Sequence, residues 1–254
     1  MSDDHDQRNR ESFQRQTRLF TAPNSPFART TATTLAWVGE LHDDLIVLDA
    51  ACGAGHVAEQ VAPQVRQVVG LDLTDDLLAI GASRLAATGV SNVLLQRGNA
   101  AAMPFVDASF DLVLCRSALH HFADCRAALE EMARVCRPGG RVAVLDMVPP
   151  DDASREDFDE LHRLIDPSHH QVLTEDEITD LLEELVGPVA LTDWGSSIRV
   201  PLSLMLNEGS QHEAALSRIK GELNGGSATG FAPAAEGDDI TVSFTHVVEH
   251  AIAR

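Results

Sequence analysis

Residues 45–61, LIVLDAACGAGHVAEQV, decide the fold. Residues 45–50 are almost wholly apolar and include β-branched side chains, which predicts a short buried strand. Small residues fill positions 51–55, and apolar side chains then recur at helical spacing over residues 56–65. This order predicts a strand, a tight turn and a helix, and the apolar run VVGLDL at 68–73 predicts a second strand after them.

The alternation of apolar runs and amphipathic segments continues along the chain. Further strands are predicted at residues 92–98, 110–116, 140–148 and 240–252, and a strand with a bend at Gly195 at residues 189–200. Further helices are predicted at 75–88, 126–137, 174–187 and 213–223. Continuous apolar strands separated by amphipathic helices are typical of a parallel sheet that is covered on both faces. We therefore predict an α/β fold with a doubly wound, mostly parallel, seven-stranded sheet.

The 254 residues suffice for one elaborated domain. Residues 1–40 are expected to form an N-terminal cap arm followed by a helix of two to three turns, and residues 41–149 the core of the sheet. Residues 150–254 are expected to complete the same domain with helical insertions and the last strands. Within this part, Thr174 and Glu177 predict a capping box at the start of a helix, and residues 224–239 a loop.

Acidic residues dominate the charge of the chain. Its 39 Asp and Glu against 19 Lys and Arg give a formal net charge of 19 − 39, or −20. Such a surface repels nucleic-acid phosphates, so no nucleic-acid partner is expected. No uncharged apolar run approaches the roughly 18 residues of a membrane span, and the acidic first residues do not resemble a signal peptide. We expect a cytoplasmic chain without a membrane span, whose oligomeric state the sequence leaves open.

The four cysteines show neither a CxxC pair nor the spacing of metal ligands, and they are Cys52, Cys115, Cys125 and Cys136. In a cytoplasmic chain they should be reduced, and we expect them to pack as small apolar side chains. No metal site is predicted.

The glycine spacing in the first turn points to a nucleotide. Gly53, Gly55 and Ala58 fit the pattern G-x-G-x-x-A, and Asp72 ends the next strand, 19 residues after Gly53. Glycines let the backbone turn sharply close to a ligand, and a carboxylate after the second strand can accept hydrogen bonds from both ribose hydroxyls. The sequence therefore predicts an adenosine-containing ligand.

Asp49 at the end of the first strand favours one such ligand over another. The pyrophosphate of a dinucleotide would face an unfavourable negative charge there. A ligand that carries a sulfonium and an ammonium group would instead be attracted by a carboxylate in a partly buried site. This argument favours S-adenosylmethionine over NAD.

The chain resembles the class I S-adenosylmethionine-dependent methyltransferases, in particular the small-molecule group that includes the ubiquinone and menaquinone C-methyltransferases. The motifs that carry this resemblance, over about residues 45–148, are VLDAACGAG (47–55), VVGLDL (68–73), GNAAAMPF (98–105), SFDLVLCRSALHHF (109–122) and EEMARVCRPGGRVAVLD (130–146). The resemblance implies a Rossmann-like methyltransferase fold and S-adenosylmethionine as cofactor.

The resemblance also implies roles for individual residues. By this resemblance, the methionine and sulfonium end of the cofactor is contacted by Asp49, Ala51, Gly53 and Gly55, together with the backbone at Arg116. The ribose is expected to contact Asp72, with Leu73 beside it. The adenine edge is expected to contact the Asn99 side chain and the Ala100 amide.

Two residues depart from the family pattern. Glycine is usual where Ala51 stands, and aspartate where Asn99 stands. Ala51 is expected to take ordinary backbone angles, and Asn99 can still accept a hydrogen bond through its amide oxygen.

Methyl transfer from a sulfonium is an in-line displacement that needs no nucleophilic residue, although a general base helps with some acceptors. The candidates are His121, His169 and Asp146. His121, like His120 before it, could instead shape its loop or line the cofactor site. His169 could be a solvated loop residue, and Asp146 could cap a neighbouring turn.

We interpret the sequence as that of an S-adenosylmethionine-dependent methyltransferase with a small organic acceptor, bound under a cap. Two alternatives stay open at this point. One is an NAD-dependent oxidoreductase, which the glycine spacing also fits, and the other is a fold that binds S-adenosylmethionine without transferring its methyl group. The acceptor, and the atom that receives the methyl group, cannot be read from the sequence.

Overall fold

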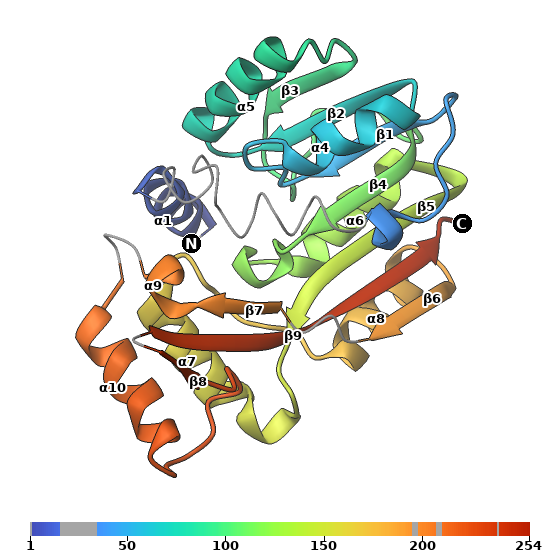
Figure 1. Cartoon of the computed structure of the whole chain (residues 1–254). Helices are drawn as coiled ribbons and strands as arrows, with labels where there is room; N and C mark the ends of the chain where they lie inside the picture. The colour runs from blue at the N-terminus through green and yellow to red at the C-terminus, as the bar shows by residue number, and fades with distance from the viewer. Residues whose placement is uncertain (1, 16–34, 195–197, 207–209, 238) are drawn as a thin grey trace.

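A computed structural model describes residues 2–15, 35–194, 198–206, 210–237 and 239–254. Its centre is one sheet in which seven strands follow the order β3-β2-β1-β4-β5-β9-β6 (Figure 1). The strands of the sheet are β1 (Ile46–Ala50), β2 (Gln67–Asp72), β3 (Val93–Arg97), β4 (Phe110–Arg116), β5 (Cys136–Val148), β6 (Val189–Trp194), β7 (Ile198–Pro201), β8 (Ala234–Glu236) and β9 (Asp239–Ile252).

The direction of the strands follows the prediction. Strands β1 to β5 pair in parallel, and β9 pairs antiparallel with both β5 and β6. The α/β class and the doubly wound, mostly parallel seven-stranded path are therefore confirmed. Two further strands, β7 and β8, pair with β9 and bring the sheet to nine strands among the described residues.

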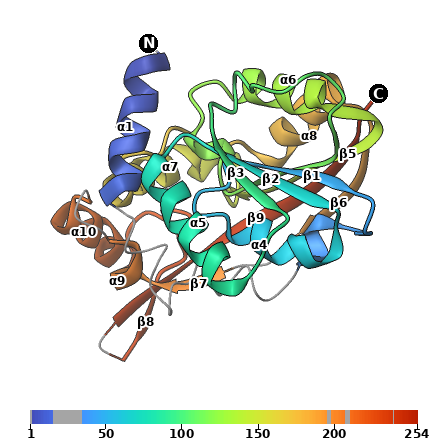
Figure 2. The ribbon, with the colours of Figure 1, turned by 90° about the horizontal axis from the view of Figure 1, so that it is seen from above.

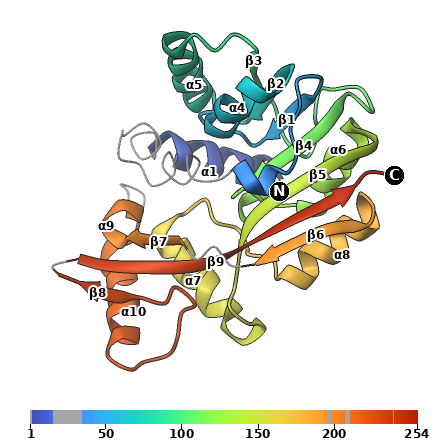
Figure 3. The same ribbon diagram turned by 45° about the vertical axis from the view of Figure 1, so that its right-hand side comes forward.

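The long strand β9 explains where the prediction was wrong in detail. The strand predicted at 189–200, with its bend at Gly195, is two strands on either side of residues 195–197, which lie outside the described residues. Strand β6 pairs with the second half of β9, and β7 pairs with residues 241–244 in its first half. Strand β8 lies in the segment that was predicted to be a loop, where it pairs with the start of β9. Figure 3 shows β9 crossing from the lower part of the molecule to the upper part.

Alternate residues of the inner strands face two hydrophobic layers. Leu48, Leu71 and Val113 point into a buried cluster with α6 (Cys125–Val135) and α8 (Glu175–Leu185). Val47, Val68 and Leu112 point into the opposite cluster with α4 (His56–Val61). Figure 2 shows α6 and α8 on one side of the sheet and α4 on the other. Helix α8 begins with the predicted capping box of Thr174 and Glu177.

A third hydrophobic cluster forms a cap at the end of the sheet where β7 and β8 pair with β9. The cap consists of α7 (Arg155–Ile165), β7, α9 (Leu202–Met205), α10 (His212–Leu223), β8 and the first half of β9. Phe158, Ile219 and Phe231 are fully buried within it. Helix α1 (Ser2–Arg15) lies between the cap and the part of the sheet that carries α5 (Asp75–Thr88) (Figures 1 and 3). The division of the chain at residues 40 and 149 remains a prediction.

The helix predicted before residue 41 is much shorter in the described part of the chain. Residues 16–34 lie outside that part, and Leu35–Val38 form a single 3-10 turn, η1. Gly39 follows with a φ of 79°, a left-handed conformation that ends a helix. No helix within the described ranges is long and apolar enough to cross a membrane.

Candidate functional site

A cavity of about 270 Å³ opens at the carboxyl ends of the parallel strands, where α/β sheets bind ligands. Three parts of the molecule line it. The loops after the strands contribute Asp49, Asp72 and Asn99, α1 contributes Phe13, and the cap contributes His162, among others. The predicted nucleotide loop and the cap therefore line the same cavity.

The turn after β1 is shaped by three residues with positive φ. Ala51, Gly53 and Gly55 have φ of 56°, 54° and 71°, all in the left-handed region. The expectation that Ala51 takes ordinary backbone angles is therefore wrong, because the turn needs a left-handed residue where the family usually has glycine. Gly55 is the N-cap of α4, and a Cβ there would lie 3.2 Å from the Leu95 side chain. Ala51 and Gly53 line the cavity, whereas Gly55 stands behind the described wall.

Asp49 is a buried carboxyl group at the wall of the cavity. Its side chain is 1% exposed, and Oδ2 accepts a hydrogen bond of 3.1 Å from the amide of Ala58 in α4. Burial raises the pKa of Asp49 to about 7, while the nearby Arg116 lowers it. A cation in the cavity would favour the ionised form, so the site suits a positively charged ligand.

Asp72 connects the end of β2 to the glycine turn. Its Oδ2 accepts from the Gly53 amide and its Oδ1 from the Thr74 amide, both at 2.8 Å. Burial raises the pKa of Asp72, and these amides lower it. The Thr74 hydroxyl and the Leu73 amide also lower the pKa through hydrogen bonds, and the carboxylate lies in the cavity wall, where hydroxyl groups of a ligand can reach it. Leu73 lies beside Asp72 on the cavity wall.

Asn99 joins the nucleotide loops to helix α1. Its amide oxygen accepts from the Ala101 amide at 2.8 Å, and its Nδ2 donates to Asp6 at 2.8 Å. Ala100 and Arg116 also line the cavity. Both polar atoms of the Asn99 side chain, which is the predicted adenine contact, therefore already have a hydrogen-bond partner. The partner of Nδ2, Asp6, lies on α1.

Helix α1 is fixed over the cavity by polar contacts that the sequence did not reveal. His5 Nε2 and Asn9 Nδ2 lie 2.8 and 2.9 Å from the carbonyl oxygen of His121. The Phe13 ring packs edge-on against the His121 ring, with 4.9 Å between their centroids. The helix therefore covers the cavity by contacting His121, which is also a candidate general base.

The three candidate catalytic residues take different positions. His121 lines the cavity, and its Nδ1 lies 3.2 Å from the Ser168 carbonyl oxygen. Burial lowers the pKa of His121 to about 4, so the imidazole is neutral at neutral pH. Asp146 and His169 are not part of the cavity wall that the described residues form.

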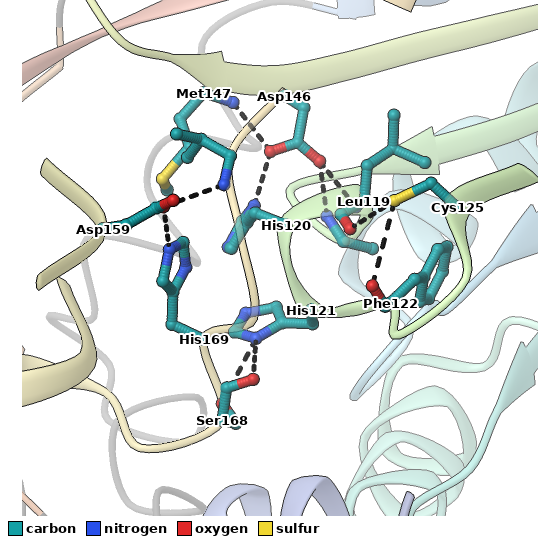
Figure 4. A network of polar contacts seen from close by, with 12 residues as sticks. Leu119, His120, His121, Phe122, Cys125, Asp146, Met147, Asp159, Ser168 and His169 are labelled. Atoms are coloured by element: carbon teal, nitrogen blue, oxygen red, sulfur yellow. Dashed lines mark hydrogen bonds and ion pairs between the residues drawn. The ribbon is translucent and has the colours of Figure 1, made fainter. Parts of the chain in front are cut away.

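Asp146 holds the turn that carries the histidines. Its Oδ2 accepts from the amides of Ala118 and Leu119 at 2.9 and 2.7 Å, and its Oδ1 lies 2.5 Å from His120 Nδ1 (Figure 4). The carboxyl group is 1% exposed, and although burial raises its pKa, the contact with His120 and the hydrogen bonds from backbone amides hold the pKa below its usual value. This arrangement corresponds to the capping role considered for Asp146, and any effect on a substrate would pass through His120.

His169 is buried rather than solvated, in contrast to the alternative considered for it. Its Nε2 lies 2.6 Å from Asp159 Oδ1, and burial is the largest cause that lowers its pKa (Figure 4). His120 and His162 line the cavity in front of it. His162 is not among the residues predicted from the sequence, although it lies at helical spacing with Phe158, Leu161 and Ile165 on the apolar face of α7. A polar residue on such a face was the signal that could have found it.

Residues 47–140 match the methyltransferase domain family. The protein named uncharacterized methyltransferase YcgJ, from Bacillus subtilis (strain 168), is 43% identical over 124 residues, which cover 48% of this chain and 49% of YcgJ. The uncharacterized protein YafE of Escherichia coli (strain K12) is 31% identical over 155 residues, which cover 57% of this chain and 75% of YafE.

A demethylmenaquinone methyltransferase of Shouchella clausii is 37% identical over 107 residues, which cover 41% of this chain and 45% of that protein. The chain therefore spans about half the length of two of these three curated relatives. The crystal structure of YcgJ matches over 90% of this chain and 96% of its own length, with a TM-score of 0.74 and 27% identity.

Proposed function

Since this chain belongs to the class I S-adenosylmethionine-dependent methyltransferases, we propose that it transfers the methyl group of S-adenosylmethionine to a small organic acceptor. The cavity carries this proposal, because two kinds of surface line it. Polar residues at the strand ends, among them Asp49 and Asp72, suit the cofactor, and the wall formed by Met147, Met205 and Phe244 suits an apolar acceptor. The methyltransferase relatives give no support to the NAD-dependent oxidoreductase that the glycine spacing alone left open.

The residues around the cavity fit the cofactor of this family. S-adenosylmethionine supplies an activated methyl group on a positively charged sulfur. Asp49 would hold the positive charge, Asp72 the ribose hydroxyls, and Asn99 with Ala100 the adenine edge. Ala51, Gly53, Leu73 and Arg116 would form the adjoining wall, and Gly55 would support the turn from behind.

The protein's main contribution to the reaction is position. An in-line displacement requires the acceptor atom to lie close to the methyl group and collinear with the bond that breaks, in a site without competing water. Helix α1 lines the cavity through Asn9 and Phe13, and the cap lines it as well, so both limit the access of water. The buried walls thus orient the acceptor.

His121 is the candidate that can touch the acceptor. Its Nδ1 faces the Ser168 carbonyl oxygen, so the lone pair lies on Nε2. With a pKa of about 4 it is a weak base, which accepts a proton only from an acceptor that becomes strongly acidic as its new bond forms. Asp146 and His169 would position this wall without touching the acceptor.

The size and charge of the site support a small acceptor. The cavity volume of about 270 Å³ is near the lower end of the roughly 300–1,000 Å³ of small-molecule pockets. The net charge of −20 opposes a nucleic-acid acceptor. We also propose a cytoplasmic location, where the four free cysteines would stay reduced.

The proposal is tested by incubating the purified chain with S-adenosylmethionine labelled in its methyl group. Small-molecule extracts, nucleic acid and protein are offered as separate acceptors. We expect label only in the small-molecule fraction, and its loss in Asp49→Asn. Binding of the cofactor without transfer to any fraction would instead support a cofactor-binding fold, and label in nucleic acid or protein would overturn the acceptor class.

A further inference from the structure

Three buried histidines from separate segments meet behind the cavity. His120 follows β4, His162 lies on α7, and His169 lies in the loop after α7. One ring nitrogen from each lies within 4.8 Å of the other two. The rings of His162 and His169 are stacked, with centroids 4.0 Å apart, and the His120 centroid lies 5.5 Å from that of His162. The three side chains are at most 4% exposed.

Two of these histidines are oriented by carboxyl groups. His120 Nδ1 lies 2.5 Å from Asp146 Oδ1, and His169 Nε2 lies 2.6 Å from Asp159 Oδ1 (Figure 4). Each carboxylate accepts a proton-bearing nitrogen, so the lone pair of His120 falls on Nε2 and that of His169 on Nδ1. Histidines that bind metal ions are oriented in this way by carboxylates.

Two of the other ring nitrogens in this cluster are unpaired within the described part of the chain. Within the described residues, no group hydrogen-bonds to His162 Nδ1 or His169 Nδ1, although both atoms are buried. Buried polar atoms are ordinarily paired, and an unpaired one calls for an explanation such as a missing ion. A metal ion would satisfy lone pairs that the packing of the fold otherwise leaves unused.

We propose that His120, His162 and His169 bind a divalent transition-metal ion of the zinc type. Imidazole nitrogen suits zinc, copper, iron and nickel, whereas magnesium and calcium prefer oxygen ligands. In tetrahedral zinc sites the metal–nitrogen distance is about 2.0–2.1 Å, so the three nitrogens would approach to about 3.3 Å. The site departs from the expectation that the chain holds no metal, which rested on cysteine spacing alone.

The position of the site suggests what the ion contacts. His120 and His162 line the cavity, while His169 stands behind them. Three protein ligands leave a fourth position open, as in catalytic zinc sites. Two of the ligands belong to the cavity wall, so the fourth coordination position of the ion would face the acceptor. A donor atom of the acceptor would bind there. This role rests on the proposed function, whereas the binding of the ion does not.

The metal site is tested on the full-length chain after removal of metal with EDTA. Equilibrium dialysis with Zn²⁺, in the absence of S-adenosylmethionine, should give one ion per chain that Mg²⁺ in excess does not displace. His162→Phe should weaken Zn²⁺ binding at least 100-fold. The matched control is His42→Gln, because His42, Asp43 and Asp44 form an exposed group of potential ligands. The substitution His42→Gln should leave the affinity for Zn²⁺ unchanged.

A spectroscopic measurement on the unmodified chain covers the case in which His162→Phe does not fold. X-ray absorption of the zinc-loaded protein should show imidazole nitrogens at about 2.0–2.1 Å. Absence of stoichiometric Zn²⁺, sulfur ligands, or loss of binding in His42→Gln would each overturn the proposal. Because dialysis needs no cofactor, these results are independent of whether methyl transfer is observed.

Discussion

The buried carboxyl group of Asp49 predicts that S-adenosylmethionine binding releases a proton. The pKa of Asp49 is about 7 in the free protein, since burial disfavours its charged form. A neighbouring cation favours that charged form and lowers the pKa in the complex. Binding therefore releases the proton from Asp49 at every pH at which the free protein still carries it. The affinity must rise with pH, because the ionised form is the one that binds.

The magnitude follows from the pKa. With a pKa of about 7, the fraction of Asp49 that is protonated is about 0.9 at pH 6 and about 0.1 at pH 8. We expect about 0.9 proton released per site at pH 6, about 0.1 at pH 8, and an affinity about tenfold higher at pH 8. Asp49→Asn removes the charge. At an effective dielectric constant of about 20 and a separation of about 5 Å, this loss is about 3 kcal/mol, or roughly 100-fold in affinity at pH 8.

Isothermal titration calorimetry in pairs of buffers with different ionisation enthalpies measures both the released protons and the affinity. Glu249→Gln is the control, because Glu249 also has a pKa raised by burial to about 7 but is not in the described wall of the cavity. It should leave proton release unchanged, whereas Asp49→Asn should abolish it. Proton release that persists in Asp49→Asn, or a pH-independent affinity in the unmodified chain, would refute the reasoning.

Three further predictions concern the ribose site, the helix over the cavity and the sheet. Asp72→Asn should weaken S-adenosylmethionine and S-adenosylhomocysteine equally, by about 2 kcal/mol for charge-assisted hydrogen bonds, as measured by calorimetry. Asn9→Ala removes the 2.9 Å bond to the His121 carbonyl oxygen and should speed cofactor dissociation about 3- to 10-fold in stopped-flow experiments, since a net hydrogen bond contributes about 1 kcal/mol. Glu249→Gln should stabilise the fold at pH 8 but not at pH 5, as measured by urea unfolding. The pKa of Glu249 in the folded chain, about 7, exceeds the ordinary 4.5. The protonated side chain therefore contributes to the free energy of unfolding below pH 4.5, and this contribution is lost as the pH rises to 7. The upper limit of the loss is about 3 kcal/mol.

Each of these predictions has a contradicting result. A loss of affinity in Asp72→Asn for only one of the two ligands would move Asp72 away from the ribose they share. Unchanged dissociation in Asn9→Ala would mean that α1 does not retain the cofactor. Lower stability of Glu249→Gln at pH 8 would mean that Glu249 is ionised and paired there, contrary to its Oε2 having no partner within the described residues.

The parallel core could be predicted from the sequence because its signals are local. The apolar runs of β1 to β5 each carry their own strand pattern, and the helix predicted at residues 75–88 has these bounds in α5. Asp49 and Asp72 could be named for the same reason, since the end of a parallel strand fixes which edge of the sheet a residue occupies. Their placement needs no knowledge of distant segments.

The rest of the site depends on contacts between segments far apart in the chain. Asp6 and Asn99 are 93 residues apart, and nothing in either neighbourhood indicates their hydrogen bond. The histidine cluster likewise unites a loop of the core with α7 and the loop after it. The division of residues 189–201 into β6 and β7 follows from the length of β9, which offers two separate edges for pairing. Local periodicity does not contain this information.

The central claim is that one ligand lies between Asp49 and Asp72, with its positive sulfur near the first and its ribose near the second. A crystal structure of the chain with S-adenosylmethionine tests it most directly. The account predicts density for the ribose hydroxyls within hydrogen-bond distance of the Asp72 carboxylate and for the sulfur on the side of Asp49. A cavity that stays empty at saturating ligand, or a ligand whose ribose lies away from Asp72, would contradict it.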